Sequence, residues 1–103
     1  MSTTNWTQGP WFTKREGWAT VYVEARIGGG LLQEVAACGP TQQGPEQQEA
    51  NATLIAEAPE LYKALEDLTG VVQSDSLLTY GKDTPYDKAI KGALAVLKKA
   101  RGE

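Results

Sequence analysis

The sequence predicts a small α+β protein, in which an antiparallel sheet of two or three strands is packed on one face by three helices. Two observations lead to this class. Residues 17–27 alternate apolar and polar side chains, three glycines follow, and residues 31–38 are rich in Leu, Val and Ala, which together are typical of a β-hairpin. Residues 45–73 and 85–101 instead have helical apolar spacing. We expect all 103 residues to form a single domain, with residues 1–16 as an N-terminal arm.

The first strand of the predicted hairpin has one clearly apolar face. Its apolar side chains are Ala19, Val21, Val23, Ala25 and Ile27, and its other face carries Trp18, Thr20, Tyr22, Glu24 and Arg26. Gly28–Gly30 supply the turn, and residues 31–38 return as the second strand. Because two strands alone are marginally stable, we expect either a third strand from Trp11 to Lys14 or a helix that covers the hairpin.

Residues 45–73 are expected to form two helices, because Pro59 cannot continue a regular helix. Proline removes a backbone donor and clashes with the preceding turn, at about 3 kcal/mol or more in a helix interior. One helix therefore ends near Ala56 to Ala58, and a second begins at Pro59. The expected apolar stripes are Ala50, Leu54, Ile55 and Ala58 on the first helix, and Leu61, Ala64, Leu65, Leu68 and Val72 on the second.

Asn51 lies beside the first of these stripes. We expect its side chain to hydrogen-bond to a strand edge or a loop and so to fix the helix on the sheet, rather than to contact a ligand.

The third helix, residues 85–101, has the clearest start signal. Thr84 is expected to cap it, Pro85 suits the first helical position, and Asp87 follows three residues after the cap. Its apolar stripe is Tyr86, Ala89, Ile90, Ala93, Leu94 and Leu97. Residues 74–83, before it, are expected to form a loop from which Leu77, Leu78 and Tyr80 point inward.

The composition argues against the common catalytic sites. The chain has no histidine, which removes the commonest general base near neutral pH and a frequent zinc ligand. Its single cysteine, Cys38, lies among alanines and a glycine and is expected to be a small buried hydrophobe. We therefore expect no enzyme, cofactor or metal. The alternative is a carboxylate-based hydrolase or a domain that binds a nucleotide or another small ligand.

The net charge and the single cysteine indicate which partners and which cellular compartment to expect. The net charge is -3, with six acidic residues between Glu46 and Asp67, so nucleic acid is an unexpected partner. Those acidic helices could imitate a phosphate backbone, although most acidic helix faces are simply solvated. A lone cysteine indicates a reducing compartment, by default the cytoplasm, and no apolar run approaches the roughly 20 residues needed to cross a bilayer.

Five of the eight aromatic residues fall in the first 22 positions, and they raise two possibilities. The arm with Trp6, Trp11 and Phe12 would fold across the second face of the sheet as a small second core. Alternatively, that face stays partly open and docks a protein partner or a second copy, as a homodimer. The contact residues would then be Trp11, Trp18 and Tyr22.

Short motifs spread over half of the chain carry a resemblance. They are Gly9-Pro10-Trp11, Glu49-Ala50-Asn51-Ala52, Leu54-Ile55-Ala56 and Ala58-Pro59-Glu60-Leu61. With these motifs the sequence resembles a family of short bacteriophage and prophage proteins. The resemblance implies a phage or prophage protein in the cytoplasm of a bacterial host, with no family active site to carry over. Small phage accessory proteins commonly act by binding a host or phage protein, so the resemblance implies a protein partner of that kind.

Overall fold

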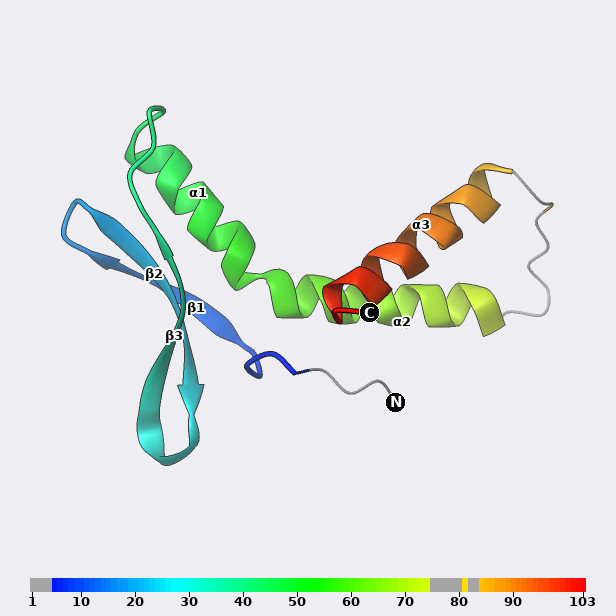
Figure 1. Cartoon of the computed structure of the whole chain (residues 1–103), viewed down its shortest axis with the longest axis horizontal. Helices are drawn as coiled ribbons and strands as arrows, with labels where there is room; N and C mark the ends of the chain where they lie inside the picture. Colours follow the sequence, from blue (N-terminus) through cyan, green and yellow to red (C-terminus); the bar gives the residue numbers. More distant parts are fainter. Residues whose placement is uncertain (1–4, 75–80, 82–83) are drawn as a thin grey trace. The chain divides into compact units, whose positions relative to one another are not determined.

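Three strands are followed by three helices in the computed structural model, which describes residues 5–74, 81 and 84–103 (Figure 1). The elements are β1 (Trp11–Glu16), β2 (Thr20–Ile27), β3 (Leu31–Cys38), α1 (Pro45–Ala56), α2 (Ala58–Ser74) and α3 (Pro85–Ala100). The predicted α+β class is therefore confirmed. The predicted inward positions of Leu77, Leu78 and Tyr80 lie outside the described residues.

Two units contain these elements. One, here called the sheet unit, is residues 6–61, and the other, the helix unit, is residues 62–103 together with residues 1–5. The sheet unit holds the three strands, α1 and the start of α2; the helix unit holds the rest of α2 and α3. The expectation of a single domain stays a prediction.

The sheet is antiparallel, with strand order β1-β2-β3. The expected third strand exists and is longer than predicted, because it runs from Trp11 to Glu16. Trp11 pairs with Ala25 and Phe12 pairs with Glu24. These two aromatic residues therefore belong to the sheet itself, and the idea of an arm that folds across its face is wrong for residues 11–16. Pairing with β2 explains this, since the strand satisfies its backbone groups along the ladder.

An irregularity interrupts the pairing of β2 with β3. Val23 pairs with Ala36, whereas Glu24 pairs with Glu34, so the register shifts between Val23 and Glu24. Val35 is thereby the extra residue of a β-bulge. It packs against the core together with its neighbour Ala36, which strict alternation along β3 would not allow.

The core of the sheet unit lies between the sheet and α1. Val21, Val23 and Ala25 are fully buried, as the alternation along β2 predicts. Val21 and Val23 pack with Ala52 and Ala56 of α1, which lies against all three strands. Ile27 belongs to the same alternating set but is exposed at the far end of the hairpin. The expectation for Cys38 is confirmed in part, since it is half-buried and packs against the core.

Helix α1 buries a different face from the predicted one. Its buried residues are Gln48, Ala52 and Ala56, spaced four apart. The expected stripe with Ala50 and Leu54 is wrong there, since Ala50 is exposed and Leu54 is 65% exposed. Small alanine side chains let the helix backbone come close to the sheet. The free energy gained by this close packing against β2 outweighs that of burying the larger leucine side chain.

The predicted break between the first two helices is confirmed. Helix α1 ends at Ala56, and the backbone N–H of Glu57 donates to Thr53 O at 3.1 Å and to Leu54 O at 3.2 Å. Helix α2 begins directly afterwards at Ala58, and Pro59 stands in its first turn, where its missing donor costs nothing. A Cβ added to Gly9 would lie 3.0 Å from Pro59 Cβ, so a larger residue there would have to push the corner back by a few tenths of an ångström.

The helix unit is joined by a polar contact between its two helices. Arg101, after α3, donates from Nη1 to the Tyr62 hydroxyl of α2 at 3.0 Å and pairs with Glu103 at 2.9 Å. These bonds, to Glu103 first and then to Tyr62, raise the pKa of Arg101. The predicted cap of α3 is confirmed, since Thr84 Oγ1 accepts from the Asp87 N–H at 3.2 Å. In the described part of the chain, none of the helices has the length and apolar character that crossing a membrane requires.

Replacing Ala52 with leucine tests which face of α1 is buried. Because Ala52 is fully buried against the sheet, we expect Ala52→Leu to lower the free energy of unfolding by about 1–3 kcal/mol through overpacking. The matched control is Ala50→Leu on the exposed side, which should change it by less than about 0.5 kcal/mol. Chemical denaturation measures both. Equal losses from the two variants would contradict the observed face.

Candidate functional site: the Trp18 turn

Trp18 is the most conspicuous side chain of the sheet unit, because 81% of it is exposed to solvent. It lies in the turn of residues 17–19 between β1 and β2. Gly17 opens this turn with a φ of 61°, a left-handed conformation that favours glycine. We call residues 17–19 the Trp18 turn. A large aromatic side chain held away from the core is a candidate contact for another molecule.

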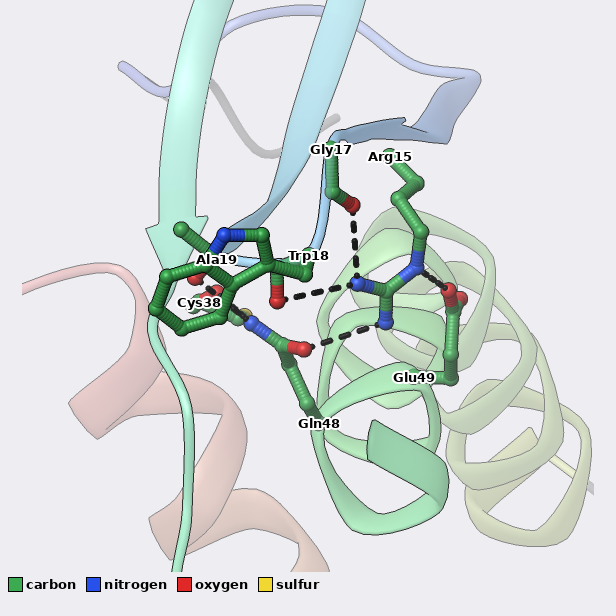
Figure 2. A network of polar contacts seen from close by, with 7 residues as sticks. All are labelled: Arg15, Gly17, Trp18, Ala19, Cys38, Gln48 and Glu49. Atoms are coloured by element: carbon green, nitrogen blue, oxygen red, sulfur yellow. Dashed lines mark hydrogen bonds and ion pairs between the residues drawn. The ribbon is translucent and has the colours of Figure 1, made fainter. Parts of the chain in front are cut away.

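Arg15, at the end of β1, ties this turn to α1 (Figure 2). Its Nη1 donates to the carbonyl oxygens of Gly17 at 3.3 Å and Trp18 at 3.4 Å. Its Nε donates to Glu49 Oε1 at 2.6 Å, and its Nη2 donates to Gln48 Oε1 at 3.0 Å. The planar guanidinium thus uses donors on three nitrogens at once, a geometry that lysine could not reproduce.

Gln48 is the buried centre of the network, with 1% of its surface exposed. Its Nε2 donates to Ala19 O at 3.0 Å and to Cys38 O at 2.8 Å, while its Oε1 accepts from Arg15. Ala19 directly precedes β2, and Cys38 ends β3. One side-chain amide therefore connects α1 to Arg15 of β1, to the turn just before β2 and to the end of β3, and the desolvation cost of burying it is offset by these bonds.

A side-chain hydrogen bond does fix the helix on the sheet, as expected for Asn51, but a different residue makes it. Asn51 is exposed, and the polar link from α1 to the sheet comes from Gln48, almost one helical turn earlier. The sequence carries only a weak signal for this residue, namely its spacing. Gln48 stands four residues before Ala52 and eight before Ala56, so all three share one helix face.

The structure does not bring the three predicted contact residues together. Trp11 pairs with buried Ala25, so it lies on the helix side of the sheet, where it packs against the core. Its indole Nε1 donates to Thr7 O at 3.0 Å. Tyr22 is half-buried on the opposite face, paired with Lys14 and Ala37. Trp18 stands apart from both because it precedes β2 and belongs to the turn.

The face of the sheet opposite α1 carries a second group of side chains. Glu24 lies there between its strand partners Phe12 and Glu34. The guanidinium of Arg26 stacks over the Phe12 ring, 5.2 Å from its centroid. Glu24 Oε1 is buried and has no hydrogen-bond partner among the described residues. An acceptor in this state would be stabilised by a donor brought from outside.

No His, Cys, Asp and Glu side chains gather in threes or more in a way that could hold a metal ion, as far as residues 5–74, 81 and 84–103 are concerned. At the Trp18 turn, the carboxylate of Glu49 is paired with Arg15 at 2.6 Å. The chemistry that the turn offers is therefore contact through an aromatic surface.

The family model described as Salmonella phage P22 protein Y8K6 matches residues 1–103. No curated protein and no solved structure matches the chain.

Replacing Gln48 with leucine tests the role of the network. Gln48→Leu leaves the carbonyl oxygens of Ala19 and Cys38 without their donor, and each buried unsatisfied group costs about 1–3 kcal/mol. We expect a clear loss in the free energy of unfolding. The neighbouring exposed residue supplies the control, Gln47→Leu, which should have little effect. If the two variants unfold at the same denaturant concentration, the network does not hold the turn.

Proposed function

This chain belongs to the family of Salmonella phage P22 protein Y8K6, and we propose that it acts by binding a host or phage protein through Trp18. In this proposal the protein is not an enzyme and works in the cytoplasm of the bacterial host. The Trp18 turn is the contact, and the indole enters an apolar pocket on the partner. The observation that carries the proposal is the 81% exposure of a tryptophan on a turn that is fixed from below.

The fixation matters as much as the exposure. A single exposed apolar side chain is ordinary on a protein surface. Here, however, the Trp18 carbonyl accepts from Arg15, and Arg15 is itself bonded to Gln48 and Glu49 on α1. Because the backbone below the indole is already ordered, binding loses less conformational entropy than it would on a mobile loop. A preorganised tryptophan is the kind of residue that dominates interface energetics.

At the Trp18 turn, the geometry supports a protein partner better than the rival functions. A carboxylate-based hydrolase needs a carboxylate that is free to exchange protons, whereas Glu49 at the turn is paired with Arg15 at 2.6 Å. Binding of a nucleotide or another small ligand needs a concave site with convergent polar groups. The Trp18 indole instead projects outward from the end of a hairpin, which favours a protein partner.

Truncating the indole tests the proposal. We expect Trp18→Ala to remain folded, since the side chain is mostly exposed, and to lose about 2 kcal/mol or more of binding free energy, which is roughly 30-fold in Kd. The measurement is affinity capture from infected host cells, followed by titration calorimetry with the purified captured protein. Leu31→Ala is the matched control, because Leu31 is an exposed apolar residue at the other end of the hairpin.

Two results would overturn this function. One is a folded Trp18→Ala variant that binds every captured protein with unchanged Kd. The other is a thermal shift of the wild-type protein with a nucleotide from a screening panel, since a ligand at 100 times its Kd adds about 2.7 kcal/mol to stability. The second result would favour the small-ligand alternative.

A further inference from the structure

The segment just before β1, residues 6–10, crosses the helix side of the sheet, and we call it the strap. The Thr7 hydroxyl donates to Gln33 Oε1 of β3 at 3.2 Å, and the Thr7 carbonyl accepts from Trp11 Nε1 of β1 at 3.0 Å. Trp11 and Gln33 are the strand partners of Ala25 on β2, one on each side. Because Thr7 is bonded to both, the strap passes over Ala25.

The burial of Ala25 agrees with this path. Ala25 is fully buried, although it lies outside the cluster in which Val21 and Val23 pack with the alanines of α1. A cover other than the buried face of α1 is therefore needed, and the strap supplies it. The strap covers the part of β2 that comes after Val23, as α1 covers the part before it.

The strap also touches the corner between α1 and α2. A Cβ added to Gly9 would lie 3.0 Å from Pro59 Cβ and 3.3 Å from Pro59 Cγ, in the first turn of α2. Helix α1 lies against all three strands, whereas α2 has no comparable contact with any strand among the described residues. The strap is therefore a direct link between the sheet and the start of α2.

We propose that the strap is a conformational device that holds the start of α2 in one position against the sheet. Pro59 breaks the helix but does not fix the direction in which the chain continues, since Glu57 and Ala58 can still rotate about φ and ψ. The strap fixes that direction by contact. Its bond to β3 is exposed to solvent, so the strap can open while the core of the sheet unit stays intact. None of the residues of the Trp18 turn takes part.

Distances between two spin labels, measured by double electron–electron resonance, test the strap. The labels are attached at Glu34→Cys on β3 and Leu61→Cys on α2, in a full-length chain that carries Cys38→Ser. Both labelled positions are exposed and belong to the sheet unit. We expect one narrow distance distribution for this reference chain, because the strap holds the start of α2 in place.

Gly9→Val should broaden or shift the distribution, because the added side chain pushes the strap away from Pro59. Gly39→Val is the matched control and should leave it unchanged, since a Cβ there meets nothing within 4 Å and neither glycine has a positive φ. Circular dichroism verifies that each variant is folded. Gly9→Ala adds only the Cβ, and it should give a smaller change in the same direction if valine disturbs folding.

Thr7→Val weakens the strap at its other end, because it removes the hydroxyl that donates to Gln33 without altering the contact at the corner. We expect it to broaden the same distribution. The control is Thr53→Val, at an exposed threonine near the end of α1, which should not. The proposal is overturned if the reference chain is already as broad as Gly9→Val, if neither Gly9→Val nor Thr7→Val changes the distribution, or if the controls change it equally.

Discussion

The amide of Gln48 is the interaction on which the sheet unit depends. It is buried, and burying an amide without partners is expensive, yet each of its polar atoms is bonded. Its partners come from β1, from the residue before β2 and from the end of β3. The amide therefore fixes the start of α1 over one end of the sheet. Once that end is fixed, the spacing of four carries Ala52 and Ala56 onto Val21 and Val23.

The alanines on the buried face of α1 also determine which residues of this helix remain exposed. Because the buried face consists of a glutamine and two alanines, the helix packs closely on the sheet and leaves larger side chains outside. The core is completed by residues from elsewhere, with Trp11 covering one side of the cluster. A core of small side chains gains less from apolar burial than one of leucines. Polar bonds at its edge are correspondingly important for this fold.

Several parts of this structure could be predicted from the sequence, for identifiable reasons. The alternation along β2 was readable because one of its faces is fully buried, and the start of α3 was readable because a local hydrogen bond sets it. The buried face of α1 was not readable, since alanine and glutamine have weak hydropathy signals and tertiary contact decided between faces. In β3, one extra residue broke the period. The role of Trp18 as a contact residue stays a prediction, and its place in a turn follows from where the pairing of β1 with β2 begins.

The β-bulge also affects whether the edge strands of the sheet can pair with another chain. A three-stranded sheet has two edge strands, and unpaired backbone groups along an edge can template aggregation with another chain. In this sheet, β1 carries Lys14, Arg15 and Glu16 along one edge, and the bulge at Val35 distorts the other. A charged edge strand and a distorted edge strand are both poor templates for pairing with another chain. Pairing of the edge strands of two copies through their backbones is therefore disfavoured at both edges of this sheet.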